Sequence, residues 1–453
     1  MGRSHQALAI GVAVLILTSV GRASARPQPA DGLKPVLHQP TIPPSGSPLT
    51  LAQAIDIALA NNPDTRTAWL EARAAEAGMG SARAAYFPEV DVLASATRSR
   101  SSAEGTRATT AITPSLALTY LLFDFGGREA QVEQARQTLV AADFANNAAM
   151  QDVVLRVQQQ YYALLDAKAL LAAQEATLKE RRANLDAADA RHKAGVATIA
   201  DVLQARTALS QAELTNESIE GNLRTIEGTL STTMGLPATT RFDFGALPME
   251  IPAQQVTEDV ARLIDDAVKQ RPELGTARAF AERARARVKE VRAEGLPTVT
   301  ATASAGQTFF NGFDTRATPF SAGIALRFPL FTGWRNTYDI RRAETEVEIA
   351  KEDLRGLEQQ VGLQVWTSYF ALQTATRRLA TSRDLLASAQ ESANVAAERY
   401  RAGVGNIIDL LTAEAALEVA RAQEVQARAD WFVSVAQLAH DVGKAEGRGQ
   451  KAE

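Results

Sequence analysis

Residues 191–203 read RHKAGVATIADVL, and residues 399–411 read RYRAGVGNIIDLL. Each stretch interrupts a long run of good helix formers with one pattern, in which an arginine precedes Ala-Gly-Val and an aspartate follows shortly after. Glycine tolerates the left-handed backbone that ends a helix, and an aspartate suits the first turn of the next one. We therefore expect each stretch to be a turn between two helices, so that the chain contains the same helical hairpin twice.

Other landmarks recur at the same spacing and indicate an internal duplication. Four pairs of positions lie 208 or 209 residues apart: Pro63 and Pro272, Pro88 and Pro297, Tyr161 and Tyr369, and Gly235 and Gly443. This period is far longer than that of solenoid repeats. We place the first repeat at 49–237, the second at 256–444, and a proline-containing linker at 238–255.

The N-terminus has the features of a secretory signal peptide, which we place at residues 1–25. Arg3 precedes an apolar run from Ala7 to Val20, and Ala23-Ser24-Ala25 forms a small-residue cleavage site. A buried N-terminal helix is the alternative. No later window approaches the ~18 consecutive apolar residues of a membrane-spanning helix. We expect an exported chain with a Pro-rich extension at 26–48 and a polar tail at 445–453.

The composition argues against several functional classes. A formal net charge of −4 argues against nucleic acid as the main partner, and the absence of cysteine excludes disulfides and thiolate metal sites. The chain lacks the phosphate-binding and nucleophile motifs of enzymes. Its four histidines are scattered: His5, His38, His192 and His440. We expect no enzyme activity, no cofactor and no metal site.

Long helices are predicted on either side of each turn. The first helix of the chain should open at Thr50 and run to about Tyr86, because Pro88 ends it. The proline-free segment 127–192 has apolar residues in a heptad column, and at 1.5 Å per residue it would reach about 100 Å. A fibrous coiled coil is the alternative that this periodicity leaves open.

Four segments alternate apolar and small polar residues, as β-strands with two different faces do. The clearest segment is 320–328, where Phe320, Ile324 and Leu326 share one face. The same alternation occurs at 116–122, 299–305 and 90–96. Such segments are typical of transmembrane β-barrels, with polar loops expected at 98–110 and 311–318. A soluble sheet packed on helices is the alternative. The small polar residues of the second face argue against that alternative.

Four strands are too few to close a barrel, since the smallest membrane barrels have about eight. Open strand edges are not tolerated in lipid. We therefore expect several chains to share one barrel, and three chains would supply 12 strands.

The sequence resembles the TolC family of outer-membrane efflux proteins. The resemblance covers both repeats and rests on the duplication, the strand placement, the motifs LFDFGGR (122–128) and LFTGWRN (330–336), and the two RxxAGVxxxxD turns. It implies a homotrimer in the outer membrane of a Gram-negative bacterium. It further implies a mainly α fold, in which a 12-helix periplasmic α-barrel continues into a shared 12-stranded transmembrane β-barrel with four strands per chain.

The resemblance also implies partners and a function. The partners would be outer-membrane lipid, a periplasmic adaptor (membrane-fusion) protein and an inner-membrane pump of the RND or ABC type. The chain would be the exit duct of that system, and the sequence leaves drug efflux and type I protein secretion both open. The alternative is a non-conducting periplasmic coiled-coil scaffold, which would have no need of strands with a lipid-facing side.

In this family the hairpin tips form the narrow periplasmic entrance and receive the adaptor. The implied pore-gate residues are Asp201, Asp409 and Tyr400. The implied adaptor contacts are Arg191, Gly195, Val196, Arg399, Gly403 and Val404. Thr198 and Asn406 stand three residues before the two aspartates as N-caps, so helix capping is a second explanation for those acids. Where some members carry another acid, this chain has Thr412.

Overall fold

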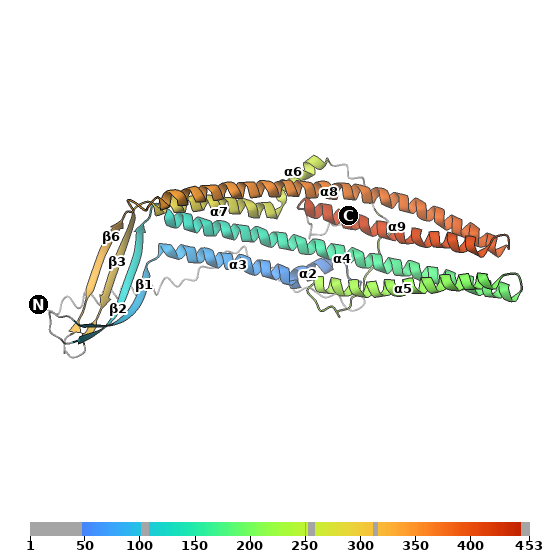
Figure 1. Ribbon diagram of the computed structural model, residues 1–453, viewed down its shortest axis with the longest axis horizontal. Helices are drawn as coiled ribbons and strands as arrows, with labels where there is room; N and C mark the ends of the chain where they lie inside the picture. Colours follow the sequence, from blue (N-terminus) through green and yellow to red (C-terminus); the bar gives the residue numbers. More distant parts are fainter. Residues whose placement is uncertain (1–47, 101–107, 250, 252–258, 311–315, 445–453) are drawn as a thin grey trace. The chain divides into compact units, whose positions relative to one another are not determined.

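The computed structural model describes residues 48–100, 108–249, 251, 259–310 and 316–444. The expected signal peptide, the tail, and all of the Pro-rich extension except Pro48 lie outside the described residues. The described chain consists of helices and one antiparallel sheet, and each half has the order helix, helix, strands, long helix, helix (Figure 1).

Each half begins with two helices rather than one. In the first half, α2 (Leu51–Asn61) is followed by α3 (Pro63–Arg83) and a short 3-10 turn, η1 (Ala84–Tyr86). The single helix expected from Thr50 to Tyr86 is therefore wrong, because Pro63 has no N–H and holds Asn62 in extended backbone at φ −65° and ψ 130°. In the second half, α6 (Val260–Gln270) and α7 (Pro272–Glu294) are separated in the same way.

The long helices form two antiparallel hairpins. The helices α4 (Gly127–Lys193) and α8 (Arg335–Arg401) have 67 residues each, which corresponds to about 100 Å. They are followed by α5 (Ile199–Thr233) and α9 (Ile407–Asp441), which return along them (Figure 1). The heptad columns are buried near mid-helix, at Val157 and Leu164 of α4 and at Val365 and Leu372 of α8.

The apolar core lies where the long helices meet the shorter ones. One cluster joins Val157 of α4 to Ile57 of α2, and another joins Val365 of α8 to Leu274 of α7. The described part of the linker has no helix, yet it packs on this core. Phe244 is buried and forms a parallel bridge with Leu49.

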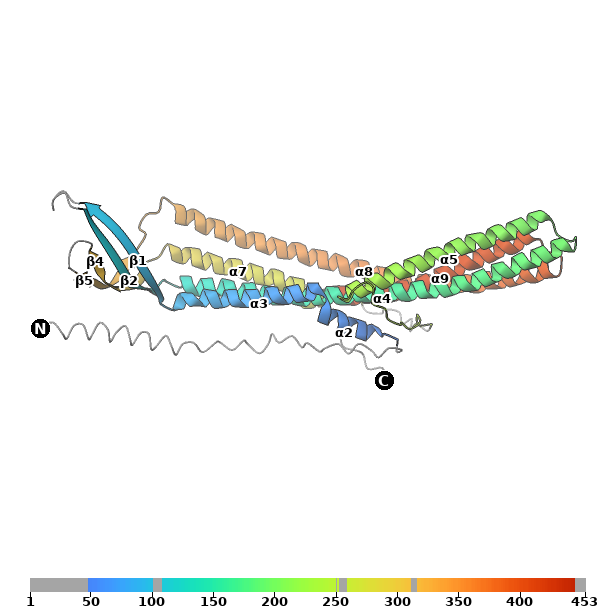
Figure 2. The same cartoon turned by 90° about the horizontal axis from the view of Figure 1, so that it is seen from below.

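The sheet has four strand paths, as expected, but two of them are interrupted. The main strands are β1 (Glu89–Arg100), β2 (Ala108–Phe123), β3 (Thr298–Gly306) and β6 (Phe320–Arg327), which pair antiparallel in that order. Two short segments, β4 (Thr308–Phe310) and β5 (Arg316–Ala317), extend the same pairing (Figure 2). Pro319 cannot donate a ladder hydrogen bond, and only its carbonyl is used, accepting from Gly306 N at 2.9 Å.

The hairpin loops are shorter than the sequence predicts. In the first, β1 continues to Arg100 and β2 begins at Ala108, since Arg98 still pairs with Thr110. In the second, β5 lies inside the predicted loop at 311–318.

The pairing register collects apolar residues on one face of the sheet. Val299 lies opposite Leu326, and Ala301 lies opposite Ile324 and, on its other side, Tyr120. On the second face, Ser304 and Ser321 are opposite each other with their Oγ atoms 2.9 Å apart. The apolar face is open within the chain, with Ile324 73 % exposed and Leu326 70 % exposed.

Both edges of the sheet are open within the described residues. The edge strand β1 pairs with β2 alone, and β6 pairs with β3 alone. Each therefore presents one row of backbone N–H and C=O groups without a strand partner in the same chain.

Candidate functional site

The two turns between the long helices have nearly the same backbone. Gly195 has φ +77°, and Val196 N donates to the carbonyl of Arg191 at 3.0 Å. In the second turn Gly403 has φ +75°, and Val404 N donates to Arg399 O at 3.1 Å. These are Schellman closures, which need a residue with a left-handed backbone, and glycine supplies it without strain. The following valines are exposed, Val196 by 66 % and Val404 by 72 %.

The two aspartates differ in their hydrogen bonds. Asp201 N donates to Thr198 Oγ1 at 3.3 Å, and Asp201 Oδ2 accepts from Thr198 N at 2.8 Å, which completes a capping box. At the other turn, Asn406 Oδ1 accepts from Asp409 N at 2.7 Å, and the described residues offer no bond to the Asp409 carboxylate in return. Capping therefore accounts for the carboxylate of Asp201, whereas that of Asp409 has only the favourable interaction of a negative charge with the first turn of α9.

Tyr400 lies just before the second turn, with its side chain buried against Ile407 and Leu410. Its hydroxyl has no hydrogen-bond partner among the described residues. Burial raises the pKa of Tyr400, the charge of Asp201 raises it further, and Arg191 opposes both. Arg191 and Asp201 thus both act on the pKa of Tyr400, while among the described residues no hydrogen bond or ion pair joins Asp409 to any of the three.

Arg191 ties the ends of the two hairpins together. Its Nη1 donates to Tyr400 O at 2.6 Å, and its guanidinium lies 4.7 Å from the centre of the Tyr400 ring. A side chain at Gly403 would also come close, since an added Cβ would lie 3.6 Å from Arg191 Nη2. The Arg191–Tyr400 contact escaped the sequence analysis because the two residues belong to different repeats and no local pattern links them.

The remaining basic residues of the turns lie at the outside. Arg399 is exposed and borders a shallow hollow that Asp409 also lines. Arg401 pairs with Glu398 at 2.6 Å, and Lys193 with Asp189 at 2.5 Å, each within its own helix. Cations at these positions suit the negative ends of α4 and α8.

A buried ionic cluster, which the sequence analysis also missed, joins the hairpins farther from the turns. Arg181 of α4 is 5 % exposed and contacts Glu414 of α9 at 2.6 Å. Burial raises the pKa of Glu414, while Asn184 and Arg181 lower it. Arg421 of α9 reaches back to Glu180 of α4 at 3.0 Å. These contacts hold α9 against α4, and no short sequence motif predicts them because their partners are more than half the chain apart.

The described residues contain no group of three or more His, Cys, Asp and Glu side chains placed to hold a metal ion. None of the described helices is both long enough and apolar enough to cross a membrane.

Comparison with known proteins gives one consistent result. The family model described as "Outer membrane efflux protein" matches residues 54–236 and 263–444 of this chain. Among curated proteins, CyaE of Bordetella pertussis is 30 % identical over 402 residues, covering 86 % of this chain and 84 % of its own. The probable efflux pump outer membrane protein TtgC of Pseudomonas putida is 28 % identical over 381 residues, covering 80 % of this chain and 76 % of its own.

Solved structures share the fold. The outer membrane protein VceC of Vibrio cholerae superposes with a TM-score of 0.76 at 22 % identity, covering 87 % of this chain and 96 % of its own. The outer-membrane channel OprN gives a TM-score of 0.77 at 20 % identity, covering 87 % of this chain and 89 % of its own.

Proposed function

The chain belongs to the outer membrane efflux protein family, and from this premise we propose that it is the outer-membrane exit duct of a three-component export system. Its cargo would be drugs, other small molecules or secreted polypeptides, which pass to the exterior. The chain supplies a path and no energy, because the pump in the inner membrane supplies that.

The observation that carries this proposal is the sheet. Its apolar face is continuous across β1, β2, β3 and β6 and is open within the chain, as lipid-facing strands require. Both of its edges also lack partners among the residues that the structure describes, and an unpaired edge is not stable in lipid. Three copies joined edge to edge would form a closed 12-stranded barrel, so we propose a homotrimer in the outer membrane of a Gram-negative bacterium.

The hairpin turns are the proposed contact with the rest of the system. They lie at the ends of α4 and α8 remote from the sheet, about 100 Å of helix away, where they would project into the periplasm (Figure 1). The exposed Val196 and Val404, with Gly195, Gly403 and Arg399, offer a small apolar surface rimmed by positive charge to a periplasmic adaptor protein. Arg191 would act from behind this surface, since its guanidinium is engaged with Tyr400.

The same turns supply the proposed gate. In a trimer the three Asp409 carboxylates, which no cap engages, would surround the axis and favour cations over anions. Asp201 would contribute charge while capping α5, and Tyr400 would support the gate from behind, since its buried side chain packs against Ile407 and Leu410 and its ring faces Arg191.

The test is reconstitution of the full mature chain. We expect the protein to fractionate with the outer membrane, to have three times the mass of one chain in detergent, and to conduct ions in planar lipid bilayers. Native mass spectrometry and single-channel recording would measure these properties. A soluble periplasmic monomer without conductance would contradict the proposal and favour the scaffold alternative.

A further inference from the structure

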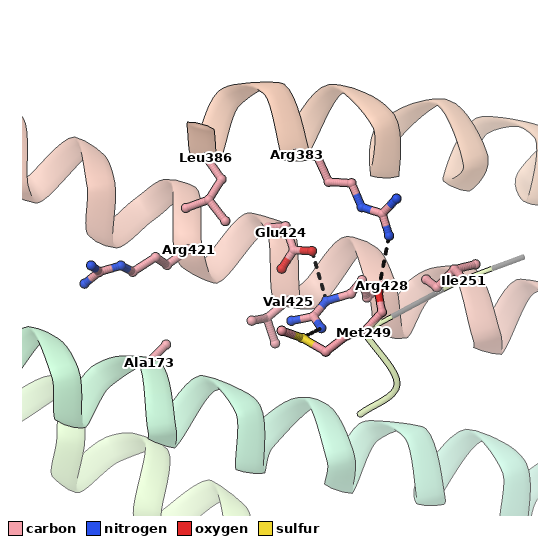
Figure 3. Close-up of a pocket in the computed structure, with 9 residues that line it drawn as sticks. All are labelled: Ala173, Met249, Ile251, Arg383, Leu386, Arg421, Glu424, Val425 and Arg428. Carbon is pink, nitrogen blue, oxygen red and sulfur yellow. Dashed lines mark hydrogen bonds and ion pairs between the residues drawn. The ribbon is translucent and has the colours of Figure 1, made fainter. Parts of the chain in front are cut away.

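A groove of about 650 Å³ lies between α8 and α9, and it is closed below by α4 and by the linker residues Met249 and Ile251 (Figure 3). It is remote from the hairpin turns and from the sheet, so neither the duct nor the gate explains it. Three arginines and one glutamate line it, which gives its walls a positive balance.

Arg428 is the least satisfied charge in this groove. Its side chain is only 8 % exposed, and Nε lies 3.0 Å from Glu424 Oε1. Nη1 points at Met249 Sδ, 3.1 Å away, and a thioether sulfur is a weak acceptor. Despite its ion pair with Glu424, Nε is a buried atom that makes no hydrogen bond of normal geometry among the described residues. A buried guanidinium with unused N–H groups is costly, and an oxyanion is the ligand that would satisfy it.

Arg383 approaches the same point from the opposite helix. Its Nη2 lies 3.5 Å from Met249 O, at the outer limit of a hydrogen bond, and Figure 3 shows its guanidinium directed toward Met249 from α8. Arg421 is not available in this way, because its guanidinium bonds Glu180 and Gln390. Arg383 and Arg428 therefore reach the same residue, Met249, from two helices.

The other part of the groove is apolar. Leu386, Val425 and Ile251 contribute side chains to its wall. The volume lies in the range of sites that hold organic ligands of drug size, and a bare inorganic ion would leave most of it empty. We propose that this groove binds a small organic anion, with its carboxylate between Arg383 and Arg428 and its apolar body against Leu386, Val425 and Ile251.

The test measures binding to the full mature protein in detergent, with no dependence on export. The probe is 2-naphthoate, which has one carboxylate and a flat apolar body. Two comparison probes separate the contributions: 2-naphthamide keeps the body without the charge, and inorganic phosphate keeps negative charge without the body. Isothermal titration calorimetry would give the affinity of each, with a blank titration into detergent micelles.

We expect saturable binding of 2-naphthoate at one site per chain, and at least tenfold weaker binding of both comparison probes. Arg383→Gln should weaken 2-naphthoate binding at least tenfold. The matched control is Arg377→Gln, which removes the same charge from an exposed arginine of α8 outside the groove and should leave the affinity unchanged. Arg428→Met would leave Glu424 without its ion-pair partner and risks misfolding, so Leu386→Glu serves as the second variant and should exclude the probe.

Three results would overturn the proposal. Equal affinity for 2-naphthoate and 2-naphthamide would remove the role of charge, and equal affinity for phosphate would remove the role of the apolar wall. Unchanged binding in both Arg383→Gln and Leu386→Glu would place the probe elsewhere. Because the measurement is made on isolated protein, a channel that binds the probe yet exports nothing would contradict the proposed function alone.

Discussion

At the residue scale, the two turns place the same motif in two different hydrogen-bonding arrangements. Both aspartates follow Ala-Gly-Val by the same spacing, but only the carboxylate of Asp201 is committed to its own helix terminus. The capping and gating explanations of these acids can therefore be separated experimentally, one residue at a time.

The first prediction concerns Asp409. Asp409→Asn should leave stability nearly unchanged, because the cap of α9 is made by Asn406 and needs only the Asp409 backbone N–H. In planar bilayers the variant should show reduced cation preference, since three negative charges leave the proposed constriction. Asp201→Asn is the matched control and should cost up to about 1 kcal/mol of stability. Wild-type ion selectivity in both variants would show that neither acid gates the pore.

The second prediction concerns the exposed valines. Val196→Asp combined with Val404→Asp should abolish export and adaptor binding without changing trimer yield, because both side chains are exposed and make no core contact. Val196→Leu with Val404→Leu keeps an apolar surface and should retain both. Co-purification with the adaptor and an export assay would measure the effect, and normal export by an abundant Asp variant would argue against docking at the turns.

Another residue, His440 near the end of α9, is held between two acids. Its Nε2 lies 3.0 Å from Asp152 Oδ1 of α4, and its Nδ1 lies 3.1 Å from Asp441 Oδ1. Burial and the nearby positive charge of Arg271 both act to lower the pKa of the ring. The hydrogen bonds to Asp152 and Asp441 outweigh them and raise the pKa to about 9. The ring is therefore charged at neutral pH and joins the two repeats.

The third prediction follows from the sign of this shift. A histidine whose pKa is raised on folding stabilises the protein fully below its usual pKa near 6.5, and this contribution is lost as the pH rises through about 9. His440→Gln should lower stability at pH 6 by about 1 to 2 kcal/mol, a range that discounts the exposed Asp152 contact. The difference in melting temperature between the wild type and His440→Gln should become smaller above pH 9. A difference that is constant with pH would contradict the assignment. The control is His192→Gln, because the ring of His192 contacts the carbonyl of Ala197 and forms no ion pair with a carboxylate among the described residues.

At the scale of elements, the strands are too short and too polar to stand out in a hydropathy profile. Their pairing nevertheless aligns their apolar residues on one face of the sheet. The register aligns Val299 with Leu326 and Ala301 with Ile324, so a single substitution can be directed to either face. This allows the lipid-facing assignment to be tested within one strand.

The fourth prediction compares neighbours on β6. Ile324→Lys places a charge on the apolar face and should cost about 2 to 4 kcal/mol of membrane stability, which should lower the amount of assembled protein in the outer membrane. Ala325→Lys places the same charge on the opposite face and should be tolerated. Fractionation and heat-modifiability on gels would measure both, and equal assembly of the two variants would mean that neither face meets lipid.

Much of the fold could be predicted at this scale, because its signals are local. Heptads and glycines indicated the long helices and their turns, alternation indicated the strands, and the resulting fold class is confirmed by the solved relatives. The missed features have physical reasons. The break at Asn62 depends on Pro63, which the sequence analysis uses only to align the two repeats. The contacts Arg191–Tyr400 and Arg181–Glu414 depend on packing between the repeats. The roles of the turn residues stay predictions.

At the scale of the whole molecule, the open edges of β1 and β6 determine how copies would meet in the proposed trimer. The strands pair antiparallel throughout, so β1 of one chain should lie antiparallel to β6 of the next. The long helices, by contrast, already pack against other elements of the same chain around buried apolar clusters.

The fifth prediction uses the absence of cysteine from the chain. A small set of double-cysteine variants, with one cysteine at position 90, 92 or 94 of β1 and one at 322, 324 or 326 of β6, should include a pair that oxidises between chains. Non-reducing gels should then show covalent trimers, whereas single-cysteine variants should stop at dimers or below. If every pair stays monomeric while both thiols react with maleimide, the two edges do not meet.

The two unpartnered edges have a genetic consequence. If each chain supplies both a β1 edge and a β6 edge to its neighbours, a damaged edge disables every ring that contains it. When sound and edge-damaged chains are made equally and mix at random, roughly one ring in eight holds only sound chains. A lesion in β1 or β6 that leaves the helices folded should therefore be dominant over the wild-type allele, whereas deletion of the whole gene should be recessive.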